Sequence, residues 1–195
     1  MDLPIYKAVI SDDDCGMYCL SLVDEPAVES NFLYFSKEKQ QFKVENEEQR
    51  IVTGVIMRCD FPIYRRTAAG YEYYVMYDKQ TIEYMAEKWL AEGLHNNINL
   101  QHNPDSVVKD IYLKEVFFKN VDRNINPKGY EDIEDGSLFG TYKVMDDAVW
   151  DEIKKGTFKG FSLEGLFDMV EVEEQTIEDE IIEMLSRIIE KNKKK

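Results

Sequence analysis

Residues that cross-link chains or bind metal ions are scarce in this sequence. Only three of its 195 residues are cysteines, Cys15, Cys19 and Cys59, and only two are histidines, His95 and His102. An odd, small number of cysteines is not typical of a disulfide framework. Cys15 and Cys19 have no further ligand beside them, so buried thiols are expected in preference to a structural zinc site. Nothing in the pattern calls for a metal ion or an organic cofactor.

Long hydrophobic runs and excess positive charge are also absent. No run of about 18 apolar residues occurs, which excludes a transmembrane helix, and the first residues lack the basic and apolar regions of a signal peptide. The formal net charge is −15 at pH 7. Such a surface repels phosphate backbones and anionic lipids, so neither a nucleic acid nor a membrane is an expected partner. We expect the protein to stay in the cytosol of the cell that makes it.

Short strands dominate what is present. Hydrophobic residues make up 44% of the chain and aromatic residues 12%, which is enough for a core. Runs rich in β-branched and aromatic residues predict strands within 6–10, 16–23, 31–36, 51–57, 71–78, 98–102, 107–118, 138–144 and 158–172. Apolar residues at helical spacing predict helices within 79–93, 146–156 and 176–195.

Many consecutive strands with few helices predict a mainly β fold, and more specifically a β-barrel decorated by helices. We assign residues 1–175 to this domain and residues 176–195 to a C-terminal amphipathic helix with a basic tail. The helix carries one apolar stripe, made of Ile177, Ile181, Met184, Leu185 and Ile188. The stripe could pack on the barrel or form the interface of a homodimer.

The stretch GFSLEG, residues 160–165, holds Ser162 between two apolar residues with a glycine at each end. A serine hydroxyl needs an imidazole within hydrogen-bond reach before it becomes a nucleophile. Gly160 and Gly165 would let a substrate backbone approach closely and would expose amides for an oxyanion. Spacing alone leaves the structural interpretation open, because serines between glycines are common in strands.

The search for a base is short, because the chain has two histidines. His95 follows a helix and is expected in an exposed turn. His102 ends the alternating run INLQH and shares parity with Ile98 and Leu100, which predicts one strand face for all three. A core histidine bonded to a backbone carbonyl is the structural alternative for His102.

Several segments resemble a family of tailed-phage serine proteases, the XkdF-type prohead, or capsid maturation, proteases. NINLQHN and LFGTYKVMDDAVWDEIKKGTFKGFSLEG carry the resemblance, and LSLVDEPAVESNFLYF and GVIMRCDFPIYRRTAAGYEYYVMYD look like the group's leading segments. The likeness runs from about Gly16 to Phe167. Its sharpest part is the acidic, Trp-containing helix followed by KGTFKGFSLEG.

The resemblance implies a fold related to herpesvirus assemblin, a closed or nearly closed β-barrel surrounded by helices. It implies Ser162 as nucleophile and His102 as base on neighbouring strands, with acyl-enzyme chemistry on peptide bonds. The region in which the family shows an acidic residue contains Glu115, which we choose for the third role. Glu164, with the parity of Ser162, is an alternative, as are His95 and the more distant Asp168 and Glu171.

A protease of this kind is expected to cut scaffolding and major capsid proteins, and itself, inside the immature prohead in the host cytoplasm. Two other functions stay open on the sequence. The same fold could serve as a catalytically silent head-assembly or scaffold-associated protein. The chain could also be an adaptor that binds partners through residues 176–195.

Overall fold

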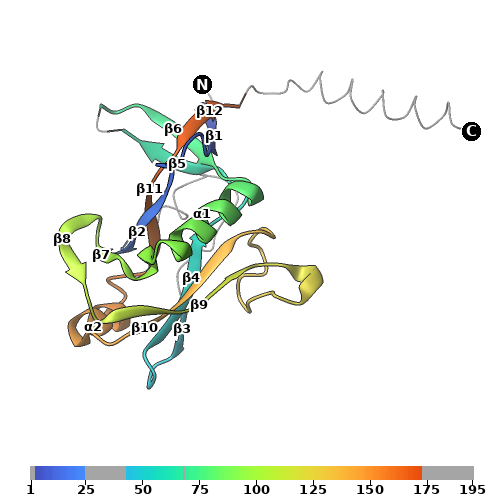
Figure 1. The fold of residues 1–195 in the computed structure, drawn as a ribbon. Helices are drawn as coiled ribbons and strands as arrows, with labels where there is room; N and C mark the ends of the chain where they lie inside the picture. Colours follow the sequence, from blue (N-terminus) through green and yellow to red (C-terminus); the bar gives the residue numbers. More distant parts are fainter. Residues whose placement is uncertain (1–2, 25–42, 68, 173–195) are drawn as a thin grey trace, which may run out of the picture.

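A computed structural model describes residues 3–24, 43–67 and 69–172 of the chain. The strand expected within 31–36 and the helix expected within 176–195 lie outside these residues. The described part contains twelve strands and two α-helices (Figure 1). The mainly β class is therefore confirmed.

The strands form three four-stranded sheets, each named here by one of its inner strands. The β1 sheet has the order β12 (Asp168–Glu171), β1 (Ile5–Val9), β6 (Glu72–Met76) and β5 (Ile63–Arg66). The β4 sheet has the order β3 (Lys43–Asn46), β4 (Ile51–Met57), β10 (Leu138–Val144) and β9 (Ile111–Phe118). The β2 sheet has the order β11 (Gly160–Leu166), β2 (Gly16–Val23), β7 (Ile98–Leu100) and β8 (Asn103–Val108).

Within the described residues these sheets do not close into a single barrel, which corrects that part of the expectation. The ladder is interrupted between β11 and β12, which follow each other in the chain yet pair in different sheets, β11 with β2 and β12 with β1. The β5 strand was also not expected, because Pro62 and the turn around Gly70 make residues 60–70 look like a loop.

Both helices begin and end where the sequence predicts. In α1 (Lys79–Ala91) the Asp78 side chain accepts a hydrogen bond from the Thr81 amide, and in α2 (Asp147–Lys155) Asp146 does the same for Val149. These N-caps satisfy amides that have no partner within the helix. The α1 helix packs against β2, and α2 lies beside β10 (Figure 1). Trp89 of α1 is fully buried in the main core cluster.

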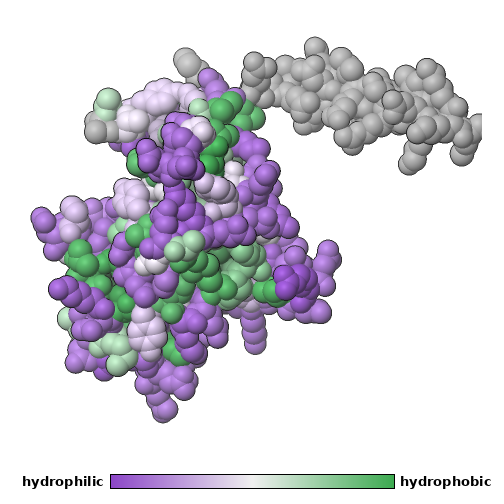
Figure 2. Space-filling model, in the orientation of Figure 1, coloured by the Kyte–Doolittle hydropathy of each residue, from purple (hydrophilic) through white to green (hydrophobic). Residues whose placement is uncertain are grey.

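The β4 strand is buried along its whole length, as its continuous apolar run indicates. Val52 and Ile56 join the main core, whereas Val55 packs into a second cluster with Tyr130, Ile133 and Phe139. The face drawn in Figure 2 is mostly hydrophilic, with smaller hydrophobic areas between the polar groups. None of the described helices has the length and hydrophobicity needed to span a membrane.

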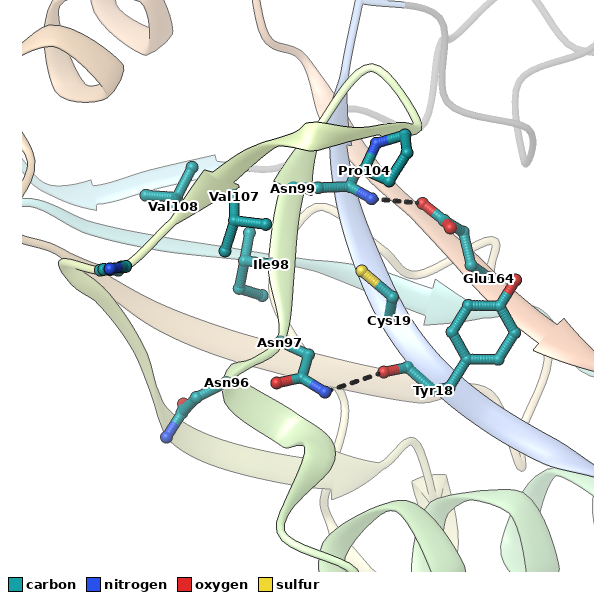
Figure 3. Close-up of a pocket in the computed structure, with 11 residues that line it drawn as sticks. Tyr18, Cys19, Asn96, Asn97, Ile98, Asn99, Pro104, Val107, Val108 and Glu164 are labelled. Atoms are coloured by element: carbon teal, nitrogen blue, oxygen red, sulfur yellow. Dashed lines mark hydrogen bonds between the residues drawn. The ribbon is translucent and has the colours of Figure 1, made fainter.

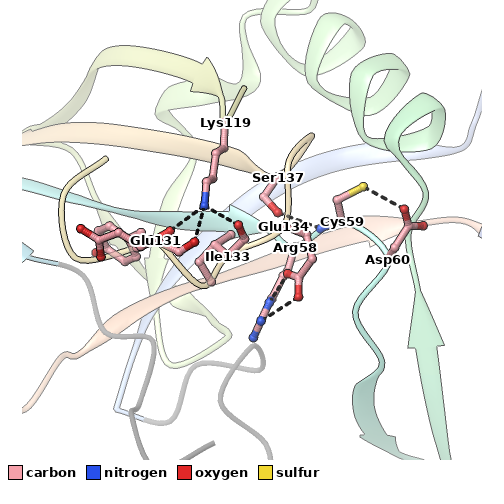
Figure 4. Close-up of polar contacts among 9 residues, drawn as sticks. Arg58, Cys59, Asp60, Lys119, Glu131, Ile133, Glu134 and Ser137 are labelled. Atoms are coloured by element: carbon pink, nitrogen blue, oxygen red, sulfur yellow. Dashed lines mark hydrogen bonds and ion pairs between the residues drawn. The ribbon is translucent and has the colours of Figure 1, made fainter. Parts of the chain in front are cut away.

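The long segment between β9 and β10 is held by polar contacts in place of strand pairing (Figure 4). Lys119 is 2% exposed, and its ammonium donates hydrogen bonds to the backbone carbonyls of Tyr130, Glu131 and Ile133. Arg58 forms a two-bond ion pair with Glu134, with N–O distances of 2.5 and 2.9 Å. These contacts anchor the segment to the β4 sheet.

Candidate active site

A row of three polar side chains crosses the β2 sheet. Strand pairing sets Ser162 opposite Ser21, and Ser21 opposite Asn99. Residues paired across a ladder share one face of the sheet, so the three side chains form a single row. The apolar rows on either side project from the opposite face into the main core; they consist of Phe161, Leu22 and Leu100, and of Leu163, Leu20 and Ile98. The alternation visible in GFSLEG thus separates a core face from a polar face.

His102 reaches this polar face from a tight turn. The β7 strand ends at Leu100, and Gln101 and His102 form a two-residue turn to Asn103, with φ values of 54° and 56°. Positive φ at both central residues is the geometry of a type I′ hairpin turn. The expectation that His102 shares a strand face with Ile98 and Leu100 is therefore wrong, because the turn carries its ring toward the face of Asn99.

Glu164 joins these groups into one cluster. Its Oε1 atom lies 2.7 Å from Ser21 Oγ, 2.7 Å from Asn99 Nδ2 and 3.1 Å from His102 Nδ1. Ser21 Oγ is also 3.1 Å from His102 Nδ1. Burial opposes ionisation of Glu164, but the hydrogen bonds from Ser21, Asn99 and His102 outweigh it and lower its pKa below the ordinary 4.5. A carboxylate that stays ionised can orient an imidazole and stabilise its charged form.

Ser162 and His102 line the same pocket, which has a volume of about 340 Å³. Glu164 and Gly165 line it as well, and its remaining walls come from Tyr18, Arg65, Tyr77, Leu163 and Phe167. Among the described residues the hydrogen bonds of His102 go to Ser21 and Glu164, and none joins it to Ser162. Ser21 is 0% exposed, whereas Ser162 is 4% exposed and borders the pocket.

A larger pocket of about 590 Å³ adjoins the first, and Tyr18 and Glu164 line both. Figure 3 shows its apolar side chains Val107 and Val108, and the Asn99 amide pointing at the Glu164 carboxylate. The Asn99–Glu164 pair thus lies where the two hollows meet.

The structure separates Glu115 from the other predicted site residues. Glu115 is exposed on β9, where it pairs with Thr141 in the β4 sheet, whereas Ser162 and His102 belong to the β2 sheet. Glu164, left as an alternative by the sequence, is the carboxylate that contacts His102. His95 lies in a 3₁₀ turn against Trp89 and lines neither pocket.

The two glycines predicted to serve an oxyanion differ in position. Gly165 borders the pocket beside Ser162, and a side chain there would lie 2.7 Å from the Gly16 carbonyl oxygen, so close backbone packing already requires glycine. Gly160 pairs with Val23 at the other end of β11 and does not line the pocket.

Sequence reasoning missed Ser21 and Asn99. Each sits between apolar residues in the same alternating pattern as Ser162, in LSL and INL. That pattern predicts a polar face, but it gives no sign of which strands pair, and the pairing gathers the cluster. Within the described ranges no three His, Cys, Asp or Glu side chains are arranged to hold a metal ion, and the three cysteines are free thiols.

The fold and the site together define a mainly β protein with a serine, histidine and carboxylate cluster beside a pocket, the set of groups that serine hydrolases use. Residues 39–171, about two thirds of the chain, match the family described as "Putative phage serine protease XkdF", and the chain belongs to this family. The match includes His102, Ser162 and Glu164 but not Ser21. No curated protein and no solved structure matches the chain.

Proposed function

We propose that the protein is a phage serine endopeptidase of the prohead, with Ser162 as nucleophile and His102 as general base. One observation carries the proposal: Ser162 and His102, distant in sequence, border one pocket, and a carboxylate holds the histidine there. The family supports a protease-like role for the chain.

Exposure favours Ser162 over Ser21 as the nucleophile. Both serines lie in the polar row, but Ser21 is fully buried and lines neither pocket. A hydroxyl has a single proton to donate, and Ser21 already has the Glu164 Oε1 and Asn99 Oδ1 atoms as acceptors for it. Ser21 therefore holds Glu164 in position by a hydrogen bond, and the Ser162 hydroxyl is the one that a substrate in the pocket can reach.

Glu164 orients the base in this proposal. Its contact with His102 Nδ1 favours the tautomer with the proton on that nitrogen and leaves Nε2 to accept the proton of Ser162. In structures without substrate, catalytic hydrogen bonds are often long and tighten when the substrate binds. The Ser162–His102 bond forms when a peptide fills the pocket.

The reaction then runs through an acyl-enzyme. Ser162 Oγ attacks the peptide carbonyl carbon while His102 takes the hydroxyl proton, which it next gives to the leaving amine. Water, deprotonated by His102, releases the acyl group and regenerates Ser162. Backbone amides beside Gly165 hold the oxyanion.

The substrates that we propose are the scaffolding and major capsid proteins of the phage, with the enzyme acting inside the immature prohead in the host cytoplasm. The family supports a phage setting, and the charge of −15 favours basic protein surfaces over nucleic acid. A homodimer is an added proposal, for which the oligomeric state in solution is the test.

Co-expression with the coat and scaffolding proteins of the same phage tests the proposed function. Ser162→Ala and His102→Ala should each abolish processing, because loss of either group in a serine protease costs about 10⁶ in kcat, as subtilisin illustrates. Ser106→Ala, on β8 and outside the lining of both pockets, is the matched control and should process normally. Normal shell maturation with Ser162→Ala would show that the catalytic assignment is wrong.

A further inference from the structure

Arg65 is an inward-facing charge in the β1 sheet. On β5 it has the same parity as Ile63, which is buried in the main core. Strand pairing places Ile63 opposite Val75, and Arg65 opposite Tyr73, so all four share one face of the sheet. Arg65 therefore points inward, and its side chain lines the pocket of Ser162 and His102.

Arg65 has no carboxylate partner among the described residues, and its Nη1 atom donates a hydrogen bond to the Tyr64 carbonyl at 3.2 Å. The chain has 39 acidic against 24 basic residues, so acidic partners are plentiful. Arg58, which is buried, has such a partner in Glu134. A guanidinium that is partly removed from water is usually paired with an anion. In this structure the guanidinium of Arg65 can bind such an anion on the side that faces the pocket.

Tyr77 is a second polar group that lines this pocket, and its hydroxyl proton has no acceptor among the described residues. The residue is 0% exposed, and its ring packs edge-on against Phe167 with centroids 5.3 Å apart. Within the described residues no hydrogen bond of ordinary geometry reaches its hydroxyl. Burial raises the pKa of Tyr77 to about 12, while the charge of Arg65 and a hydrogen-bonding contact with its guanidinium act in the opposite direction. The guanidinium can only donate, so the Tyr77 hydroxyl keeps its own proton to donate. Buried hydroxyls are normally satisfied, so this one points to a missing partner.

We propose that Arg65 and Tyr77 form a carboxylate-binding subsite, which makes the protein select peptides with an acidic group close to the cleaved bond. This inference rests on the proposed function, because the pocket is the one that Ser162 and His102 line. A guanidinium and a phenolic hydroxyl are both donors, and a carboxylate accepts from both and also carries the charge opposite to that of the guanidinium. Glu164 lines the same pocket, and its Oε1 atom is held by Ser21, Asn99 and His102.

Binding to the Ser162→Ala protein tests the subsite without catalysis. We would titrate the full chain with N-acetylglutamate amide and N-acetylglutamine amide and follow its NMR signals. A charge-assisted contact should make the glutamate compound bind at least about tenfold more tightly. Arg65→Gln and Tyr77→Phe, made in the same background, should each reduce that preference. Arg66→Gln, an exposed neighbour with the opposite parity, is the matched control.

Two further ligands separate the sources of the carboxylate. N-acetylalanine carries a free C-terminal carboxylate, and N-acetylalanine amide does not. Preferential binding of the glutamate compound supports recognition of an acidic side chain, whereas preferential binding of N-acetylalanine supports recognition of a chain end. Equal binding of all four compounds, or wild-type preference in a folded Arg65→Gln protein, would overturn the proposal. Thermal unfolding shows whether the variants fold, and Arg65→Lys, which keeps the charge, should keep part of the preference.

Cleavage of a randomised library of acetylated and amidated peptides completes the test. The protein with Ser162 intact should cut preferentially beside one position rich in Glu or Asp, and Arg65→Gln should bring the ratio of acidic to neutral products toward one. Cleavage without a preference for acidic residues would contradict the proposed subsite and still support the proposed function. Carboxylate binding that depends on Arg65, in a protein that cleaves no peptide, would support the subsite and contradict the proposed function.

Discussion

The β4 sheet and the β2 sheet both carry polar side chains on buried faces, but they use them differently. In the β4 sheet, Thr53 and Thr141 lie opposite each other with their hydroxyl oxygens 2.8 Å apart, and both are 2% exposed. Lys119 at the end of β9 gives its donors to three backbone carbonyls. The two threonines hydrogen-bond to each other, and Lys119 hydrogen-bonds to the carbonyls; none of the three residues lines either described pocket.

In the β2 sheet the polar row is left incomplete. Ser162 has no hydrogen bond to His102 although both border one pocket. Tyr77, which lines this pocket from outside the β2 sheet, has a hydroxyl without a partner of ordinary geometry among the described residues. Burial of polar groups is thus common to both sheets and does not mark a site. Hydrogen-bonding capacity left over at the wall of a pocket distinguishes the candidate site from structural polar contacts.

The largest difference between the two sheets should appear when one glutamate in each is replaced by glutamine and the cleavage rates are compared. Glu164→Gln removes the charge that orients His102, so the cleavage rate should fall by about 10²- to 10⁴-fold. Glu115 is exposed on β9 of the β4 sheet, so Glu115→Gln should change the cleavage rate less than about twofold. Steady-state kinetics on one peptide substrate measure both. If Glu115→Gln were the variant that slowed cleavage, the carboxylate that orients His102 would be Glu115 of the β4 sheet.

Lys119→Met should give the largest loss of stability in the β4 sheet. The change leaves three buried carbonyls without their shared donor, at a cost of about 3 kcal/mol in the free energy of unfolding. Lys114→Met, at an exposed position on β9, should cost less than about 0.5 kcal/mol. Denaturant unfolding monitored by Trp fluorescence gives both values. A mild Lys119→Met variant would mean that the contacts seen in Figure 4 do not hold the β9–β10 segment.

The Thr53–Thr141 pair should behave as a closed unit. Thr141→Val leaves the Thr53 hydroxyl buried without its partner and should cost about 1 to 2 kcal/mol. The double variant Thr53→Val/Thr141→Val should cost less than the sum of the two single changes, because no orphaned hydroxyl remains. A double-mutant cycle by denaturant unfolding measures the coupling. Strict additivity would show that the two hydroxyls do not depend on each other.

The smallest expected effect is the pH dependence of stability due to Glu164. Because its pKa is lower in the folded protein than the ordinary 4.5, its contribution is present above that value and is lost as the pH falls through the lower, folded pKa. The stability difference between wild type and Glu164→Gln should shrink as the pH is lowered from about 6 through the folded pKa of Glu164. A constant difference over that range would place Glu164 in a neutral environment.

Local sequence patterns predicted the strands and helices well where an apolar run or a helical spacing was not interrupted by proline. The runs GMYCLSLV, IVTGVIM and LFGTYKV coincide with β2, β4 and β10, and both described helices lie within the predicted ranges. The β5 strand was missed because four residues between a proline and a turn carry too little periodicity to predict pairing with β6.

The site was predictable only in part, because it depends on pairing between distant strands. Sequence reasoning and the resemblance chose Ser162 and His102, but parity placed His102 on the core face, since it assumes that a strand continues through a two-residue turn. The choice of Glu115 over Glu164 could not be settled by spacing. The antiparallel pairing of β11 with β2 and the turn after β7 place Glu164 beside His102.

The most direct test of the central claim is the position of a covalent adduct. The wild-type protein would be treated with a fluorophosphonate, which reacts with activated serines, and the labelled peptide would be located by mass spectrometry. We expect the adduct on Ser162 in the wild type and in Ser21→Ala, a much slower reaction in His102→Ala, and no adduct in Ser162→Ala. An adduct on Ser21, or cleavage of substrate by a protein in which Ser162 never reacts, would contradict the account.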